Sequence, residues 1–408
     1  MSILIKNALL DEIKQDIFIE GNKIARIGQN LTFKAQKVIN ATGKAAIPSL
    51  INGHTHAAMT LLRGFADDMP LKEWLETKIW PMEAKLTQED IYWGTRLAAL
   101  EMIKSGTTFF NDMYWYPETA AKAVEDSGIR ALINHVIIGS PDNSKEEQVN
   151  KLLKLKSSTV DIGLGPHAIY TVPKEGLVWA KKIADQNNIK LHIHLSETRQ
   201  EVIDCQKVNG CRPVEYLQEI GFLGPNVIAA HGVWLNDHEI KILKHDDVKI
   251  IHCPTSNMKL ASGNSLPYNK LRENKISLGL GTDGCSSNNN LDMFEEMKMA
   301  SLLQKHDLKS ATVLSANEAF EMGANAKIFG LDCGKIEEGK LADLLLIDLE
   351  NPDLIPNYNL RSNLIYSANG SCVDTTICNG KVLMENKMLK DEEKIIGKAK
   401  EFAKAHSK

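Results

Sequence analysis

The feature that most limits the possible folds is a regular alternation of short apolar runs with amphipathic stretches, which begins near residue 45 and ends near residue 280. This alternation is typical of strand–helix units around a parallel sheet. Thr87-Gln88-Glu89-Asp90 resembles a helix-capping sequence, and Gly106 marks the end of the same helix. We expect eight strands, at Ala45–Ile51, Thr107–Phe110, Ala131–Ile138, Ile162–Gly165, Lys190–His194, Val227–Ala230, Val248–His252 and Ile276–Leu280. Eight such units predict an α/β fold, a closed (β/α)₈ barrel of the TIM type.

The two ends of the chain have a different pattern. Short alternating stretches with turn signals such as Glu20-Gly21-Asn22-Lys23 fill the first 44 residues, and Ala342–Ile347 and Thr375–Val382 resume this pattern near the other end. We therefore expect residues 1–47 and 336–408 to form one small β-sandwich domain, and residues 48–335 to form the barrel.

Composition narrows the class of partner. The net charge of −4 over 408 residues provides no basic surface for nucleic acid, and no apolar run is long enough to span a membrane, so we expect neither as a partner. Seven cysteines without a Cys-x-x-Cys pair favour reduced, mostly buried thiols and a cytoplasmic location. The expected partner is a small molecule, and a homo-oligomer is expected from base rates alone.

Polar residues collect where the predicted strands end, which is where barrels of this kind have their active sites. The first strand leads into His54-Thr55-His56, and the preceding Asn52-Gly53 predicts a tight turn of the backbone. The other such residues are His167 after the fourth strand, His194 and Glu197 at the fifth, His231 at the sixth and Asp283 after the eighth.

These residues predict a metal site. Two histidines spaced two apart on an extended chain point to the same side, so His54 and His56 can share one metal ion. His194 and Asp283 would complete three histidines and one carboxylate, with a position left open for water. The fourth strand, Asp161–Pro166, contains no lysine that could bridge a second ion. We expect one zinc ion per subunit, with iron, manganese or nickel as alternatives. Two half-exposed histidines and a turn aspartate are the competing interpretation.

Glu197 follows His194 by three residues, so its carboxylate can lie over the metal and move protons as a general acid and base. His231 can polarise the attacked centre, and Asp283 can accept a proton from water as well as bind metal. A solvated loop glutamate is the alternative for Glu197. His192 and His252 are expected to be packed or to support the ligands, and His135, His238, His245, His306 and His406 carry no local signal.

Several segments together resemble the amidohydrolase superfamily over almost the whole chain. They are Asn52–His56, His194–Thr198, His231-Gly232, His252–Asn257 and Gly281–Gly284. More narrowly, the chain resembles the 5-methylthioadenosine/S-adenosylhomocysteine deaminase group, in Leu62–Gly64, Trp80–Glu83, Gly165–Tyr170, Lys259–Gly263 and Gly339–Asp343.

The resemblance implies the same four metal ligands, a proton shuttle at Glu197 and a catalytic histidine at His231. It also implies that Glu83 accepts hydrogen bonds from both ribose hydroxyls and that His167 lies by the sugar, and a carboxylate suits a vicinal diol because it has two oxygens. Trp80 and Leu75 could wall the purine or its 5′ substituent. Without the resemblance, Glu83 would be taken as a helix-surface residue and Trp80 as core.

The chain departs from this group in one respect. Relatives that accept S-adenosylhomocysteine carry arginines after the third strand, whereas residues 131–150 here offer only Lys145 as a cation. Arg199 could substitute. Smaller substrates such as 5′-methylthioadenosine, 5′-deoxyadenosine or adenosine are therefore favoured.

The leading hypothesis is hydrolytic deamination of an adenosine-type nucleoside to the inosine-type product and ammonia. The alternatives are deamination of a free base such as guanine or cytosine, hydrolysis of an s-triazine on the same metal site, or a scaffold protein without catalysis. Glu83 discriminates among them, because a free base has no diol to bind.

Overall fold

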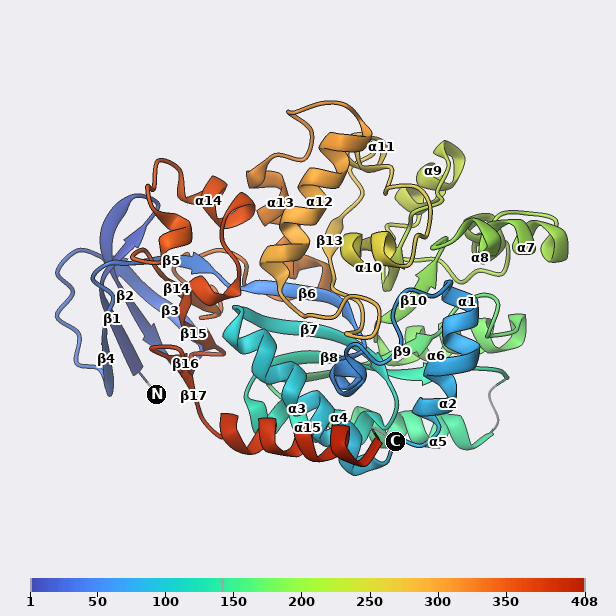
Figure 1. The fold of residues 1–408 in the computed structure, drawn as a ribbon, viewed down its shortest axis with the longest axis horizontal. Helices are drawn as coiled ribbons and strands as arrows, with labels where there is room; N and C mark the ends of the chain where they lie inside the picture. Colours follow the sequence, from blue (N-terminus) through green and yellow to red (C-terminus); the bar gives the residue numbers. More distant parts are fainter. Residues whose placement is uncertain (1, 141–142, 407–408) are drawn as a thin grey trace.

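A computed structural model describes residues 2–140 and 143–406 and contains a parallel barrel with a companion sheet beside it (Figure 1). The barrel strands follow the chain in order, each paired in parallel with the next: β6 (Leu50–Thr55), β7 (Thr107–Tyr114), β8 (Arg130–Ile137), β9 (Val160–Pro166), β10 (Leu191–Leu195), β11 (Val227–His231), β12 (Lys249–His252) and β13 (Leu278–Leu280). Just past β13, the Asp283 N–H donates to the His54 carbonyl at 2.9 Å. This bond joins the last strand to the first, and the predicted fold class is confirmed.

Helices cover the outside of the barrel. Thr87 caps the long helix α3 (Gln88–Lys104) by accepting from the Asp90 N–H, as the sequence predicts. The others are α4 (Pro117–Ser127), α5 (Asn143–Leu153), α6 (Lys174–Asn187), α7 (Arg199–Asn209), α8 (Pro213–Glu219), α9 (Asp237–His245), α10 (Pro254–Lys259), α11 (Tyr268–Glu273), α12 (Met293–Asp307), α13 (Ala316–Gly323), α14 (Leu360–Tyr366) and α15 (Glu392–His406). After β6 come η1 (Ala57–Leu62), α1 (Leu71–Trp74), the wider turn η2 (Leu75–Ile79) and α2 (Trp80–Glu83). Short 3₁₀ turns lie at η3 (Ala326–Phe329), η4 (Pro352–Leu354) and η5 (Gly370–Cys372).

The barrel interior is layered because alternate strand residues face inward. An apolar layer closes one end, where Phe109 packs on Phe329 of η3 with ring centroids 4.6 Å apart. Its other strand members are Ile51, Leu132, Ile228 and Ile251. Above it lies a buried polar layer that contains Asn111, Asn134 and His192. This polar layer supports the ends of the strands where the predicted site residues lie.

The two ends of the chain meet in one mixed sheet of nine strands (Figure 1, blue and red). Its side chains enclose a separate core that includes Ile5, Ile17 and Leu346. The strands are β1 (Ser2–Leu10), β2 (Ile13–Glu20), β3 (Lys23–Gly28), β4 (Lys37–Asn40), β5 (Lys44–Pro48), β14 (Leu344–Asp348), β15 (Val373–Cys378), β16 (Lys381–Glu385) and β17 (Met388–Leu389). A buried ion pair between Arg130 of β8 and Asp343, at 2.9 Å, connects this sheet to the barrel.

The prediction of the first strand, Ala45–Ile51, was wrong in its bounds. Residues up to Pro48 pair with β14 in the companion sheet, and a new strand starts at Leu50, because proline has no N–H to continue a ladder. Gly53 makes no tight turn but lies within β6. A Cβ there would lie 2.9 Å from the Leu280 carbonyl, so glycine allows β13 to approach β6.

The division of the chain at residues 47 and 336 stays a prediction. The helix α15 lies along the barrel helix α3 rather than against the companion sheet (Figure 1), and Lys104 pairs with Glu392 at 2.6 Å. Among the described helices, none has the length and apolar character needed to cross a membrane.

Candidate active site

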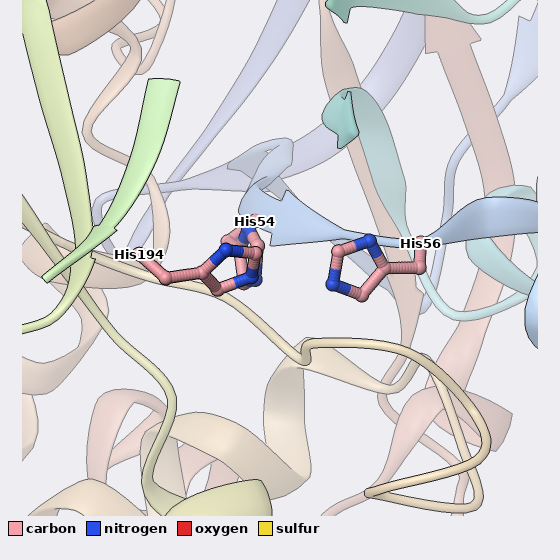
Figure 2. A group of neighbouring side chains, drawn as sticks. All are labelled: His54, His56 and His194. Carbon is pink, nitrogen blue, oxygen red and sulfur yellow. The ribbon is translucent and has the colours of Figure 1, made fainter. Parts of the chain in front are cut away.

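Four predicted metal ligands lie together at the carboxyl ends of three strands. The ligand atoms of His54, His56 and His194 lie within 4.8 Å of one another, and the three rings converge on one space (Figure 2). The Oδ1 atom of Asp283 lies 3.2 Å from His56 Nε2 and 3.4 Å from His54 Nε2. His54, His231 and Asp283 form a second group whose ligand atoms lie within 4.8 Å of one another, so the three predicted ligand histidines and the carboxylate gather around His54 although they come from distant parts of the chain.

Each of these histidines has an acceptor at its Nδ1 atom. The Met113 carbonyl accepts from His56 at 2.6 Å, and the His167 carbonyl accepts from His194 at 2.7 Å. A carbonyl can only accept, so Nδ1 carries a hydrogen, and in the neutral ring Nε2 keeps a lone pair. This is the arrangement that second partners impose on metal-binding histidines.

His54 also carries its hydrogen on Nδ1, but here the acceptor is another histidine. Its Nδ1 lies 2.7 Å from His192 Nε2, and His192 Nδ1 lies 2.9 Å from the Ile228 carbonyl. His192 must donate to that carbonyl, so its Nε2 accepts from His54. The Nε2 atom of His54 is buried and has no hydrogen-bond partner in the described chain. An orphaned buried lone pair that faces two further histidines and a carboxylate fits a divalent metal ion.

The charges of the site also fit a cation. Burial lowers the pKa of His54 to about 4 and holds the pKa of His194 well below its usual value. Burial also opposes protonation of His56, but the hydrogen bond and charge of Asp283 outweigh it and raise the pKa of His56 to about 9. A metal ion bound at this position would displace the His56 proton and take over its interaction with Asp283.

His231 differs from the three histidines that are predicted to bind the metal. At its Nδ1 it meets a donor, the side-chain amide nitrogen of Asn257, at 3.0 Å. The hydrogen of the neutral ring therefore lies on Nε2, and burial keeps the ring neutral by lowering its pKa to about 4. This Nε2 atom lies 3.8 Å from Oε2 of Glu197. His231 thus presents an N–H group to the site where the other histidines present lone pairs.

Glu197 is buried, with only 6% of the residue exposed. Burial and the neighbouring charge of Asp283 raise its pKa to about 8, so it can hold a proton near neutrality. A buried carboxyl of this kind is suited to general acid and base catalysis.

Three residues of the site have left-handed backbone conformations, which non-glycine residues rarely adopt. The φ angles are 49° at Ser196, 74° at His231 and 62° at Asp283. Each follows or ends a barrel strand and turns the chain at the mouth of the barrel. Such conformations cost about 1 kcal/mol or more each and concentrate at functional sites.

One cavity joins these groups to the predicted substrate residues. It is open to solvent and is lined by Trp80, Glu83, His167, Glu197 and His231 as well as by His56, His194 and Asp283. His54 lies beneath it, fully buried. Apolar walls are provided by Leu71, Trp74, Leu75, Met113 and Ile138. The described lining contains no lysine or arginine, and Arg199 is exposed on α7 outside it.

Glu83 lies at the end of the helical segment 71–83 and is half-buried. Burial raises the pKa of its carboxyl, whereas Tyr114, the His56 charge and Trp115 lower it. The carboxylate therefore lies close to Tyr114 and Trp115, at the end of β7, and within electrostatic range of His56.

The family model for the amidohydrolase family matches residues 45–383, which is most of the chain. The chain belongs to the amidohydrolase family.

This amidohydrolase is similar to enzymes named for nucleoside deamination. It is 48% identical to a 5′-deoxyadenosine deaminase from Methanospirillum hungatei, over 98% of this chain and 93% of the relative. It is 47% identical to a 5-methylthioadenosine/S-adenosylhomocysteine deaminase from Archaeoglobus fulgidus, over 98% of both chains. A crystal structure of an adenosine deaminase from Xanthomonas campestris with bound zinc aligns with a TM-score of 0.93 and 32% identity, over 99% of this chain and 98% of that one. The predicted family and the prediction of a hydrolase of carbon–nitrogen bonds are confirmed.

Several residues that build the site of this amidohydrolase were not predicted from its sequence. Tyr114 and Trp115 line the cavity, but the predicted second strand stopped at Phe110. The polar Asn111 and Asp112 were the available signal, since polar residues at a strand end mark the mouth of a barrel. Ser256, which donates to Asp283 Oδ2 at 2.7 Å, and Asn257 were part of a motif without being assigned a role.

Proposed function

We propose that this amidohydrolase removes the 6-amino group of adenosine-type nucleosides that carry a small, uncharged 5′ substituent. 5′-Deoxyadenosine and 5′-methylthioadenosine are the preferred candidates, and the products are the inosine-type nucleoside and ammonia. The observation that carries the proposal is the single cavity that joins the His/Asp group and Glu197 to the half-buried carboxylate of Glu83. The names of the similar enzymes support it.

The proposed ligands of one zinc ion are His54, His56, His194 and Asp283, and iron, manganese or nickel are the alternatives. A divalent cation supplies Lewis acidity that makes water acidic enough to attack near neutral pH. Support comes from the ligand atoms of His54, His56 and His194, which lie within 4.8 Å of one another, and from the buried Nε2 of His54, which has no hydrogen-bond partner among the described residues.

Protons are assigned to three side chains. Asp283 and Glu197 accept a proton from the attacking water, and Glu197 delivers it to the ring nitrogen next to C6. The oxygen adds to C6, and His231 stabilises the developing negative charge through its Nε2–H. Glu197 then moves the remaining proton of the added hydroxyl to the amino group, so that the bond between C6 and this nitrogen breaks, ammonia leaves and the carbon–oxygen double bond forms.

The other end of the cavity is assigned to the sugar and the 5′ group. Glu83 would accept hydrogen bonds from both ribose hydroxyls, with His167 beside the sugar, and Trp80 and Leu75 would pack against the purine or the 5′ substituent. The carboxylate of S-adenosylhomocysteine would find no cation in this lining, and burying an unpaired charge is costly. A small apolar 5′ substituent carries no charge, so burying it in this lining has no such free-energy cost.

We also propose a homo-oligomer without a nucleic-acid or membrane partner, and a cytoplasmic location. Seven free cysteines among the described residues fit a reducing compartment.

The test is ammonia release by the zinc-loaded protein with 5′-deoxyadenosine, 5′-methylthioadenosine, adenosine, S-adenosylhomocysteine, guanine, cytosine and an s-triazine. Preference for the nucleosides with uncharged tails supports the proposal. Preference for S-adenosylhomocysteine contradicts the tail assignment, and turnover of free bases or triazines alone contradicts the nucleoside assignment.

Glu83→Ala tests the ribose contact separately. We expect this variant to lower kcat/KM for nucleosides by about 10- to 100-fold, because it removes hydrogen bonds to a charged group. An adenine free base, if it is turned over at all, should be affected far less. Equal losses for the nucleoside and the base would remove Glu83 from the sugar site.

A further inference from the structure

The loop between β10 and α7 determines where the Glu197 side chain points. Ser196 and Glu197 directly follow the strand that carries His194, and Ser196 has the left-handed φ of 49°. A serine gains nothing intrinsic from this conformation, so other contacts must hold it. One such contact is the hydrogen bond from the Trp234 N–H to the Ser196 carbonyl at 2.9 Å, and the others come from Glu201.

Both oxygens of the Glu201 carboxylate bind this turn. Oε1 accepts from the Ser196 N–H at 2.8 Å, and Oε2 accepts from the Glu197 N–H at 2.8 Å. Glu201 lies in the first turn of α7 and is only 7% exposed. Burial raises the pKa of the Glu201 carboxyl to about 8, whereas the two backbone N–H groups and the positive end of the helix favour its ionised form.

Other helices of the chain show that this is not ordinary capping. In α8, α9 and α13, the glutamate at the third helical position accepts from the N–H of the capping residue itself: Glu215 from Arg212 at 2.8 Å, Glu239 from Asn236 at 3.0 Å and Glu318 from Ser315 at 2.7 Å. Glu201 has the same position relative to its cap, Thr198, yet its hydrogen bonds extend one and two residues further back, onto Glu197 and Ser196.

We propose that Glu201 is a positioning residue for the proton-transfer step. It holds the Ser196–Glu197 turn in its left-handed form and so directs the Glu197 carboxylate toward His231 and the reacting centre. The inference rests on the proposed function, in which Glu197 moves the protons. Without both acceptors the Ser196 peptide can relax toward a common conformation, and a displacement of about 1 Å of a reacting group can cost roughly 100-fold in rate.

The first test compares Glu201→Gln with Glu215→Gln, a matched change of a capping glutamate on the neighbouring helix. An amide has one acceptor oxygen, and its NH₂ group opposes one of the two N–H donors. We expect Glu201→Gln to lower kcat by about 10- to 100-fold, as for other residues that orient active-site groups. The KM should stay within about threefold of the wild-type value, and the zinc content should not change. Glu215→Gln should leave kcat within about twofold. A kcat for Glu201→Gln near that of Glu215→Gln overturns the proposal, and so does a loss that appears only in KM or in zinc content.

A second measurement does not depend on turnover. Crystal structures of the wild-type protein and of Glu201→Gln should differ at Ser196, where φ becomes negative, and in the Glu197 carboxylate, which should move by about 1 Å or more. An unchanged turn overturns the inference even if the enzyme acts on nucleosides. Conversely, if the wild type releases no ammonia from any nucleoside, the proposed function fails, whereas the structural comparison still decides the role of Glu201.

Discussion

Replacing His192 should weaken metal binding although it is not one of the proposed ligands. His192 is fully buried and accepts the Nδ1 hydrogen of His54. In His192→Leu this N–H has no acceptor, or the hydrogen moves to Nε2 and occupies the lone pair that faces the metal position. His192→Gln offers an amide oxygen in its place and should restore part of the loss.

The size of the effect follows from the hydrogen bond that is lost. A buried donor without a partner costs about 1 to 3 kcal/mol. Because a tenfold change in affinity corresponds to about 1.4 kcal/mol, the zinc dissociation constant should rise by roughly 5- to 150-fold. The free-energy cost of the lost hydrogen bond applies only to the state in which His54 binds the metal. The loss should therefore be measured as a lower affinity for zinc.

Competition for zinc with a chromophoric chelator measures this dissociation constant. His252→Leu is the matched control, since His252 is 1% exposed and neither of its ring nitrogens has a partner in the described structure. Its replacement should leave zinc affinity within about twofold. Equal losses for His192→Leu and His252→Leu would refute the reasoning, because the effect would then reflect general destabilisation of the core.

Three further predictions concern chemistry, specificity and pH. Glu197→Gln should retain zinc but lower kcat by about 10² to 10⁴-fold in a steady-state ammonia assay, and near-normal turnover would exclude Glu197 from proton transfer. Ile138→Arg adds a cation to the half-exposed rim of the cavity and should raise kcat/KM for S-adenosylhomocysteine relative to 5′-deoxyadenosine by about tenfold or more; an unchanged ratio would contradict the tail assignment. Burial raises the pKa of Glu296 from 4.5 to about 8, so the folded state binds this proton more tightly and the free energy of unfolding should fall as pH rises across that interval. Glu296→Gln should flatten this dependence in urea titrations, and an unaltered slope would show that another group is responsible.

Much of the barrel could be predicted because each strand carries its own local pattern. β11 and β12 were predicted to within one residue of their observed bounds, since a run of apolar residues and a turn signal define each. The first strand was placed wrongly because the apolar run from Ala45 to Ile51 belongs to two sheets, and only the partners of Pro48 and Leu50 reveal the break. β7 was cut short because Asn111 and Asp112 look like the start of a loop although both are buried.

Part of the site could also be predicted, because some of its residues lie in local sequence patterns. The spacing of His54 and His56 is local, the ends of the predicted strands supplied His194, Glu197 and Asp283 as candidates, and the resemblance supplied Glu83. What the sequence does not contain is the direction of each hydrogen bond. The contact between His54 and His192 joins residues 138 positions apart, and Asn257 meets His231 across two strands. These contacts decide whether a histidine presents a lone pair or an N–H group to the site, and they form only once the barrel is closed.

The seam between β6 and β13 has a consequence for folding. Thr55 donates to the Asp283 carbonyl at 3.1 Å across 228 residues of chain, and the proposed ligands His54 and Asp283 lie on the two sides of this seam. A cation held there ties the first barrel strand to the last, and binding that is restricted to the closed state stabilises it in proportion to ligand concentration. We expect amide hydrogens along this seam to exchange with solvent first when zinc is withdrawn. The same metal ion that is proposed for catalysis would then also stabilise the closed barrel.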